Sequence, residues 1–452
     1  MARVLVPGDI GDIVVCKFGG TSCADTQQLR KVADIVESDK RRRYVVVSAF
    51  GKRSGVNNDH GCTDLLFLCH QYVKNGFQIE PAFRLVKDRY RQIKAGLQLS
   101  MDLERHLLEI EEGILTCRET PDFTASRGEY LMAILVSELL QVPFVDATEV
   151  IFFNFNGELD VKRTQSALED MASRIGQAVI PGYYGVNPDG KIKTFSRGGS
   201  DITGAIVAKG VGASLYENWT DVSGLLMADP QVVADPKPIA QVTYTELREL
   251  AYSGAKVIHP EAIAPVRKAD IALNIRNTNR PDDLGTMIVP DNYSFDDSPL
   301  VTGIAGRKNF TVLHFAKEGM NSQLGIGCQL LSILVRHKVN WEHMSTSLDS
   351  ISIVMPTSEL KEDKERHILH DIHNELEPDS VETSADMALI ATVGRRMAHR
   401  PGISGKLFSA LGNEGINVRM INQGSSEINV IIGVKNEDFE KAIRAIYGAF
   451  CK

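Results

Sequence analysis

The segment Ser196–Asp201 carries residue types that could bind a phosphate or a carboxylate. Its two glycines leave backbone N–H groups open, and arginine, serine and aspartate flank them. Helix-forming sequence follows from Ile202 to Lys209. The open N–H groups would therefore stand at a helix N-terminus, where the helix dipole favours an anion.

A second turn of this kind lies near the start of the chain. Val14–Phe18 reads as a buried strand that contains Lys17, and a Gly-Gly turn follows it. The hydroxyls of Thr21 and Ser22 are candidates to cap a helix that begins near Asp25. One such turn could serve only to reverse the chain, but two of them indicate a polyanionic ligand. The chain has neither a Walker A sequence nor the G-x-G-x-x-G dinucleotide pattern, so phosphate must be bound in another way.

A third element delivers a second lysine. In Leu250–Pro260 a predicted helix ends at Gly254, and Lys256 follows two residues later. Transfer of a phosphoryl group needs positive charge on its oxygens and correct positioning, with little covalent help from the protein. Lys17 and Lys256 could supply that charge, and Asp201 could hold the lysines or help to organise a metal ion.

Composition excludes several classes of protein. The chain has 452 residues, 43% of them hydrophobic and 24% charged, which is typical of a globular protein with two to four domains. A net charge of -8 argues against nucleic acid or an anionic membrane as a partner. The N-terminal sequence does not resemble a signal peptide, and no apolar run is long enough to span a membrane, so we expect a cytoplasmic protein. The seven cysteines lack C-x-x-C spacing and are expected to be reduced thiols. We expect Arg41–Arg43 to form a solvated helix end.

The order of the elements predicts the fold. From Ile13 to about Pro290, strand-like runs alternate with helical stretches, which predicts an α/β three-layer sandwich with a largely parallel central sheet. The stretch from Phe77 to Glu119 is helix-prone and would cover or extend the core. The polar segment Gly51–Gly61 is either a mobile loop near the site or an ordinary connection.

A proline-flanked polar stretch, Pro290–Pro299, marks a boundary beyond which the pattern changes. A strand–helix–strand–helix unit then occurs twice, which predicts two small ferredoxin-like α+β modules. Modules of this kind usually regulate a protein or dimerise. The predicted strands and helices are 310–315, 327–337, 350–355 and 360–376 in the first module, and 387–393, 402–414, 427–434 and 437–447 in the second.

Several ordered motifs resemble those of aspartate kinases, members of the amino-acid-kinase superfamily with C-terminal regulatory ACT modules. The resemblance covers essentially the whole chain and implies a catalytic domain over 1–298, a first ACT module over 299–376 and a second over 377–452. The motifs are Lys17–Ser22, Ser126–Glu129, Ser196–Asp201, Trp219–Val222 with Ala228–Pro230, and Gly254–Pro260.

The resemblance implies a role for each matching residue. Catalysis would use Lys17, Lys256 and Asp201. Arg197 would bind the α-carboxylate of L-aspartate and Glu129 its α-ammonium, with Ser48, Thr63 and Ser200 lining the same pocket. The nucleotide would contact Lys17, Gly19, Gly20, Gly199, Thr220, Asp221, Leu226, Asp229 and Lys256. Relatives often carry tyrosine at the position of Leu226 and arginine at that of Gln231, so the nucleotide contacts there depart from the family pattern.

The implied reaction is the transfer of phosphate from ATP to the β-carboxylate of L-aspartate, which starts the pathway to lysine, threonine and methionine. No general base is required, because the attacking carboxylate, with a pKa of about 4, is already ionised. Mg²⁺ would bind mainly to the phosphates, and no metal site made by the protein is expected. The rivals are a kinase for acetylglutamate or glutamate, and an amino-acid-sensing protein with a decayed kinase fold. Glu129 argues against an acylated amine because it requires a free ammonium.

The ACT modules imply feedback control by an amino acid bound between modules of two subunits, and hence a homodimer or a higher homo-oligomer. The candidate effector residues are Met320, Ser322, Glu342, Ser345 and Thr346. An acidic side chain in that pocket favours lysine as the effector, with threonine as the alternative. The modules could also serve only to dimerise the chain.

Overall fold

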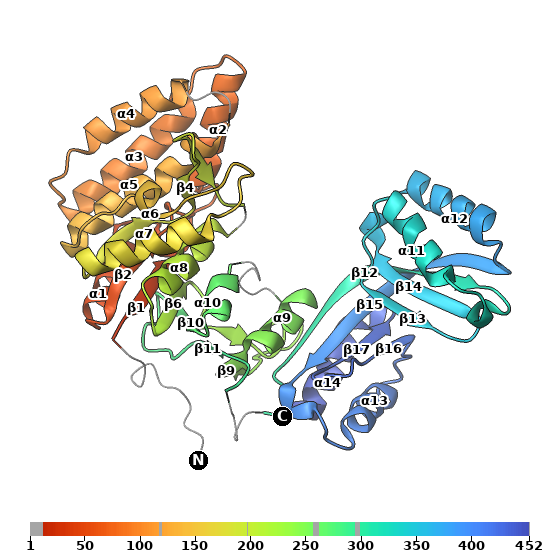
Figure 1. Cartoon of the computed structure of the whole chain (residues 1–452). Coiled ribbons are helices and arrows are strands. Elements are labelled where there is room, and N and C mark those ends of the chain that lie inside the picture. Colours follow the sequence, from red (N-terminus) through yellow and green to blue (C-terminus); the bar gives the residue numbers. More distant parts are fainter. Residues whose placement is uncertain (1–11, 117–119, 197, 256–261, 294–298, 452) are drawn as a thin grey trace. The chain divides into compact units, whose positions relative to one another are not determined.

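The computed structural model describes residues 12–116, 120–196, 198–255, 262–293 and 299–451 (Figure 1). These residues form two compact units. The first unit contains the described residues as far as Leu225, then Pro238–Thr245 and 262–293. The second contains Leu226–Lys237, 246–255 and 299–451.

A seven-stranded sheet with the order β3-β2-β1-β6-β10-β11-β9 forms the centre of the first unit. Neighbouring strands are parallel except for β10 and β11, which are antiparallel. Every residue of β1 is buried, as expected for a parallel sheet that helices cover on both faces. The predicted largely parallel sheet is confirmed. The strands are β1 (Val14–Phe18), β2 (Arg42–Val47), β3 (Ala178–Pro181), β6 (Leu215–Thr220), β9 (Gln241–Thr243), β10 (Ala272–Asn277) and β11 (Thr286–Val289), with the shorter β4 (Tyr184–Val186), β5 (Ile192–Thr194), β7 (Leu225–Leu226) and β8 (Pro238–Ile239) outside this sheet.

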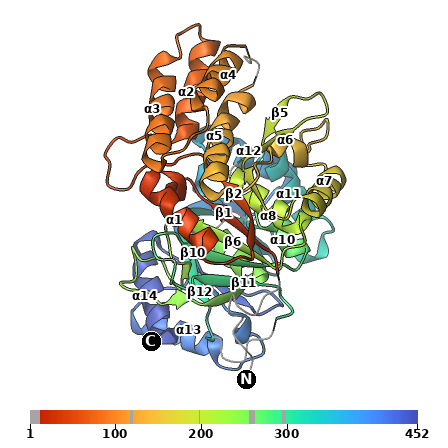
Figure 2. The ribbon, with the colours of Figure 1, turned by 90° about the vertical axis from the view of Figure 1, so that its left-hand side faces the viewer.

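Helices form the two outer layers of this sandwich. Alternate residues of β1 face opposite ways, and Val14, Cys16 and Phe18 join a core with α1, α2, α3, α4 and α5. Helix α8 packs on the other face, against β1, β2 and β6. Figures 1 and 2 show α2, α3 and α4 gathered beside α5. The helices are α1 (Thr26–Glu37), α2 (Cys62–Lys74), α3 (Glu80–Leu97), α4 (Leu103–Thr116), α5 (Asp122–Leu140), α6 (Ala147–Val150), α7 (Val161–Arg174), α8 (Gly199–Gly210), α9 (Tyr244–Tyr252) and α10 (Ala264–Lys268).

Two local expectations need correction. Helix α1 is capped by Asp25, whose carboxylate accepts a hydrogen bond from the backbone N–H of Gln28 at 2.9 Å. Thr21 and Ser22 do not cap it, because they belong to a short 3₁₀ turn that precedes Asp25. The Ser22 hydroxyl instead lies 2.8 Å from that of Thr278.

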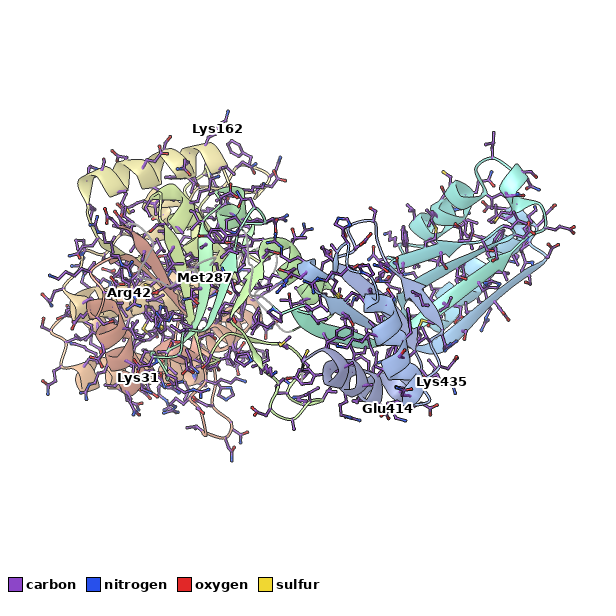
Figure 3. All side chains as sticks on the ribbon, turned by 90° about the horizontal axis from the view of Figure 1, so that it is seen from below. Lys31, Arg42, Lys162, Met287, Glu414 and Lys435 are labelled. Atoms are coloured by element: carbon purple, nitrogen blue, oxygen red, sulfur yellow. The ribbon has the colours of Figure 1, made fainter. Side chains whose placement is uncertain are left out.

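The expected solvated helix end at Arg41–Arg43 is wrong for Arg42. This residue begins β2, and its buried guanidinium lies 2.8 Å from Glu217 Oε2 on β6. Arg276 from β10 also contacts Glu217, at 3.3 Å. Burial alone would raise the pKa of Glu217, but these arginines hold that pKa below its usual value. In Figure 3, Arg42 lies inside the first unit, whereas the exposed Lys162 projects from its surface.

The second unit is built on a six-stranded sheet with the order β13-β14-β12-β15-β17-β16. The order of the predicted strands and helices is confirmed in both modules, and each module adds one short edge strand. Buried residues of α11 and α12 pack on β12 and β14 to form the core of the first module. The elements are β12 (Gly303–Ala316), α11 (Ile326–Arg336), β13 (His343–Thr346), β14 (Ser350–Pro356), α12 (Glu362–Leu376), β15 (Ser380–Val393), α13 (Ile403–Asn413), β16 (Met420–Asn422), β17 (Asn429–Val434) and α14 (Phe439–Phe450).

Two long strands run through both modules. Residues Gly303–Arg307 of β12 pair with the end of β15, whereas Phe310–Ala316 pair with β14 and with the start of β15. The register shifts between Arg307 and Phe310, where Asn309 has a φ of 68°. Each module therefore uses part of both strands, and the division at residues 376 and 377 stays a prediction. Within the described ranges, no helix combines the length and the apolar character needed to cross a membrane.

Candidate active site

Lys17 stands near the carboxyl end of β1 and points toward α8. Its Nζ atom lies 2.7 Å from Asp201 Oδ1, in the first turn of α8, and 3.5 Å from Asn218 Oδ1 on β6. Asn218 Nδ2 also donates to Asp201 Oδ1 at 2.8 Å. The Lys17 side chain is only 9% exposed, so the Asp201 carboxylate supplies the charge that a buried ammonium requires. Sequence reasoning paired Lys17 with Asp201 but missed Asn218.

The glycine turn after β1 keeps the space beside this ammonium open. The backbone N–H of Gly19 donates to the carbonyl of Trp219 at 3.1 Å. A Cβ atom at Gly19 would lie 3.3 Å from Lys17 Nζ, so a side chain there would crowd the ammonium. Gly51, the first residue of the polar loop 51–61, donates its N–H to the carbonyl of Gly20 at 2.7 Å. That loop therefore begins against the predicted phosphate turn.

The predicted turn at Gly198 and Gly199 leads into α8, as expected. Gly198 adopts a φ of 71°, and no side chain caps the helix that begins at Gly199. The Tyr216 hydroxyl donates to the carbonyl of Asp201 at 3.1 Å and ties this first turn to β6. Ser200 is buried in the same turn. The predicted carboxylate ligand Arg197 lies outside the described residues.

Glu129 is a buried acid without a counter-charge among its described contacts. It lies on α5, is 4% exposed, and its Oε2 atom has no hydrogen-bond partner. Burial raises the pKa of Glu129 to about 8, against a smaller opposing effect of the Ala49 backbone. A carboxyl group held in this way would gain from a cationic partner, such as an ammonium.

The other predicted substrate residues are chain neighbours of the groups around Glu129. Ala49 follows Ser48 at the end of β2, and Cys62 precedes Thr63 at the start of α2. A Cβ atom at Gly128 would meet Ala49 Cβ and Cys62 Sγ, each at 2.7 Å, which shows how closely these segments approach. Burial raises the pKa of the Cys62 thiol, so this thiol stays protonated.

The predicted nucleotide residues fall in both units. Thr220 ends β6 in the first unit, and its hydroxyl lies 3.2 Å from Asp221 Oδ1. Leu226 and Asp229 belong to the second unit. Leu226 is 40% exposed, and the Asp229 carboxylate accepts the N–H of Gln231 at 2.8 Å, as a turn-forming aspartate does. Lys256 lies outside the described residues.

The predicted effector residues lie in the first module. Met320 is buried in its core, and Ser322 donates to the carbonyl of Gly319 at 2.8 Å. Ser345 and Thr346 are exposed on the edge strand β13. Glu342 precedes this strand, and its Oε2 atom lies 2.6 Å from Arg307 Nη2. Sequence reasoning did not identify this arginine.

Comparison with known proteins agrees with this geometry. Residues 12–277 match the amino acid kinase family, and residues 390–450 match an ACT domain. The chain is 36% identical to aspartokinase 3 of Bacillus subtilis, over 96% of this chain and 98% of that relative. The chain belongs to the aspartate kinases. The resemblance predicted from its motifs is confirmed.

Solved structures of other aspartate kinases extend the comparison. The crystal structure of Clostridium acetobutylicum aspartate kinase is 48% identical, with a TM-score of 0.92 over 97% of this chain and 100% of that one. Escherichia coli aspartokinase III in complex with lysine and aspartate is 27% identical, with a TM-score of 0.75 over 98% and 100% of the two chains. The same enzyme in complex with aspartate and ADP is 28% identical, with a TM-score of 0.73 over 97% and 100%.

Removal of the Lys17 ammonium should suppress turnover. We expect Lys17→Ala to lower kcat about 10²- to 10⁴-fold, because the charge acts on the transferring phosphoryl group, and we expect the same of Lys256→Ala. Steady-state kinetics with saturating ATP and aspartate measure the effect. Lys162→Ala, which removes an exposed lysine of α7, is the control. Near-normal kcat in Lys17→Ala would contradict its assignment.

The raised pKa of Glu129 predicts a pH dependence. Below about pH 8 the free enzyme carries this carboxyl protonated, so binding an ammonium requires loss of the proton. The kcat/KM for aspartate should therefore rise with pH and level off above about 8. Glu129→Gln should lower kcat/KM and remove this rise, whereas Glu138→Gln on the same helix should keep it. If Glu129→Gln kept the wild-type pH dependence of kcat/KM, Glu129 would have no role in binding aspartate.

Proposed function

We propose that this aspartate kinase transfers the γ-phosphoryl group of ATP to the β-carboxylate of L-aspartate and forms 4-phospho-L-aspartate. That product begins the pathway to the aspartate-derived amino acids. The observation that carries the proposal is the Lys17 ammonium, held by Asp201 and Asn218 beside an open glycine turn. The Escherichia coli relative in complex with aspartate and ADP supports the choice of substrates.

Charge and position would account for the chemistry. Lys17 and Lys256 would neutralise the phosphoryl oxygens, and the backbone N–H groups of Gly20 and Gly199 would donate to phosphate oxygens. The N–H of Gly19 already donates to Trp219, so the contribution of Gly19 would be the space it leaves beside Lys17. Asp201 keeps the Lys17 side chain in one orientation, so little reorganisation is needed when charge develops. The attacking β-carboxylate is ionised at neutral pH, so no residue is assigned as a general base.

Recognition of aspartate would rest on its two α-groups. Glu129 would pair with the α-ammonium, and Arg197 would grip the α-carboxylate through two parallel hydrogen bonds. Ser48, Thr63 and Ser200 would add hydroxyl contacts. With both α-groups fixed, the length of the side chain decides whether its carboxylate reaches the phosphoryl group. This geometry would discriminate against glutamate.

Mg²⁺ would be held mainly by the phosphates. Among the residues that the structure describes, no three His, Cys, Asp or Glu side chains gather into a metal-binding group. Mg²⁺ commonly binds through one or two carboxylates together with substrate phosphates, and Asp201 would contribute one carboxylate. The ion would neutralise phosphate charge.

Allosteric control by an amino acid is the second part of the proposal, with lysine as the favoured effector and threonine as the alternative. Glu342 offers a carboxylate to an effector ammonium, and Ser345 and Thr346 offer hydroxyls on an edge strand. An edge strand also presents backbone groups to a second copy of the chain. Met344 on this strand and Leu348 just after it are 38% and 64% exposed, which supports a homodimer or higher oligomer through these modules.

A hydroxamate assay tests the reaction. Acyl phosphate formed from ATP, Mg²⁺ and L-aspartate should be trapped by hydroxylamine, whereas L-glutamate and N-acetyl-L-glutamate should give only background product. Hydroxamate formed with glutamate and not with aspartate would make glutamate the substrate in place of aspartate. Absence of signal with all three acids would overturn the proposed activity.

The effector assignment predicts inhibition by millimolar lysine. Glu342→Gln should raise the lysine concentration for half-inhibition by about 5- to 150-fold, the range typical of allosteric coupling. Glu359→Gln, in the same module but beyond β14, is the control and should keep the wild-type response. A wild-type enzyme that responds neither to lysine nor to threonine would leave the modules with a structural role only.

A further inference from the structure

Helix α3 carries a buried arginine that reaches the predicted phosphate turn, residues 19–22, from outside the sheet. Arg89 Nη1 donates to the carbonyl of Ala24, two residues beyond that turn, at 3.1 Å. Arg89 Nη2 donates to Asp59 Oδ1, in the polar loop 51–61, at 2.6 Å. The side chains of Arg89 and Asp59 are 9% and 7% exposed, so each charge depends on the other in place of water. One guanidinium therefore joins two separate segments of the first unit.

Asp59 also folds the polar loop onto itself. Its carboxylate accepts hydrogen bonds from the backbone N–H of Arg53 at 2.7 Å, and from Arg53 Nε and Nη2 at 3.1 and 3.0 Å. The base of the loop is closed, because the N–H of Cys62 donates to the carbonyl of Phe50 at 3.0 Å. Burial alone would raise the pKa of Asp59, but the hydrogen bonds from Arg53 and the charge of Arg89 hold that pKa well below its usual value. The carboxylate is therefore ionised at neutral pH.

The start of the same loop packs backbone against backbone on the predicted phosphate turn. The N–H of Gly51 donates to the carbonyl of Gly20 at 2.7 Å. A Cβ atom at Gly51 would lie 2.6 Å from the carbonyl carbon of Gly20 and 2.9 Å from the nitrogen of Thr21, so no side chain fits between the two segments. A shift of the loop would therefore move the backbone of Gly20, whose N–H is proposed to donate to a phosphate oxygen.

We propose that Arg89, acting through its ion pair with Asp59, is a positioning residue for the phosphates of ATP. By holding Ala24 and Asp59 at once, it fixes the end of the phosphate turn and the loop against which that turn packs. The inference rests on the proposed use of the Gly20 N–H in phosphate binding, and it adds the side chain that keeps this backbone in place. The sequence predicted only that residues 77–119 cover or extend the core. Arg89 gives that helical segment a part in the reaction.

A fixed turn matters because phosphoryl transfer depends on position. Backbone N–H groups stabilise a phosphate best when they already point at its oxygens as charge develops. A misplacement of about 1 Å, even from a change remote from the reacting atoms, can cost about 100-fold in rate. Aspartate binding should be less sensitive: Ala49, beside the predicted aspartate pocket, precedes Phe50, and the Phe50 ring also packs on that of Tyr90, with 5.1 Å between the centroids.

Variants of both partners test this role. Arg89→Met keeps a long apolar side chain beside the Phe50 ring, over which the guanidinium lies at 4.9 Å from the centroid, but removes both donors. Asp59→Asn removes the partner's charge with almost no change in shape, and it tests the same contact if Arg89→Met does not fold. Arg91→Met on the same helix is the matched control, because Arg91 also donates twice to a carboxylate, that of Glu104 at 2.8 and 2.7 Å, but at an exposed position. Hydroxamate assays of the full chain give kcat and the two KM values, and thermal unfolding gives Tm.

We expect Arg89→Met to raise the KM for ATP and to lower kcat/KM for ATP about 10- to 100-fold, with the KM for aspartate within about twofold. Asp59→Asn should act in the same direction, and Arg91→Met should behave as the wild type. The double variant of Arg89→Met with Asp59→Asn should be at most about twofold worse than Arg89→Met, because both changes break one contact. Effects that multiply in the double variant would overturn the proposal.

A purely structural role of Arg89 gives a different result. It would lower Tm and the active fraction, but the KM for ATP does not depend on the amount of active enzyme and would keep its wild-type value. That result would overturn the proposal, as would equal rises in the KM for ATP and for aspartate. A wild-type chain without aspartate-dependent hydroxamate would remove the proposed function and this proposal together. An active wild type with unchanged kinetics in Arg89→Met would remove the role of Arg89 alone.

Discussion

A buried ammonium must have a counter-charge, and the arrangement of the first unit follows from this requirement at Lys17. Water is largely excluded from this side chain, so the Asp201 carboxylate replaces the lost hydration. The pairing of β1 with β6 sets Asn218 opposite Lys17, and the first turn of α8 brings Asp201 to the same face of the sheet. The chain thus fixes a positive charge near the carboxyl end of an interior strand, and ligands of such folds usually bind beyond the carboxyl ends of the strands.

Glu129 is a buried ionisable group of the opposite kind, because it lacks the ion pair that Lys17 has. Its carboxyl group is as deeply buried, but no described side chain forms an ion pair with it, and burial raises its pKa to about 8. A buried acid with a raised pKa costs stability as the pH rises above the ordinary pKa of a carboxyl group, because the unfolded chain ionises first, and the cost is complete above about pH 8. A bound ammonium would remove this cost. The protein itself therefore holds Lys17 in place, whereas the proposed partner of Glu129 is a group of the substrate.

Motifs and element order could be predicted from the sequence because they are local. The glycine turns, Lys17, Asp201 and the repeated strand–helix units each occupy a short stretch of chain. Pairings between distant segments could not be predicted: Arg42 meets Glu217 across 175 positions, and that contact exists only because β2, β1 and β6 are neighbours in the sheet. Arg307 was missed for the same reason. Asn218 left a weak signal, since Glu217 and Asn218 are polar residues flanked by Tyr216 and Trp219 within a strand.

The segment Leu226–Lys237, which contains the predicted nucleotide residues Leu226 and Asp229, belongs to the second unit together with the ACT modules, as does the segment 246–255. The Met227 carbonyl accepts the N–H of Ile304 on β12, at 2.7 Å, and the Tyr447 hydroxyl of α14 accepts the N–H of Lys237, at 2.9 Å. Through such bonds these segments share the packing of the modules. A change in the modules therefore reaches predicted catalytic segments without a long pathway through the kinase core. The proposed coupling of regulation to nucleotide binding would need no separate relay, because the segment with Leu226 and Asp229 is hydrogen-bonded to the modules.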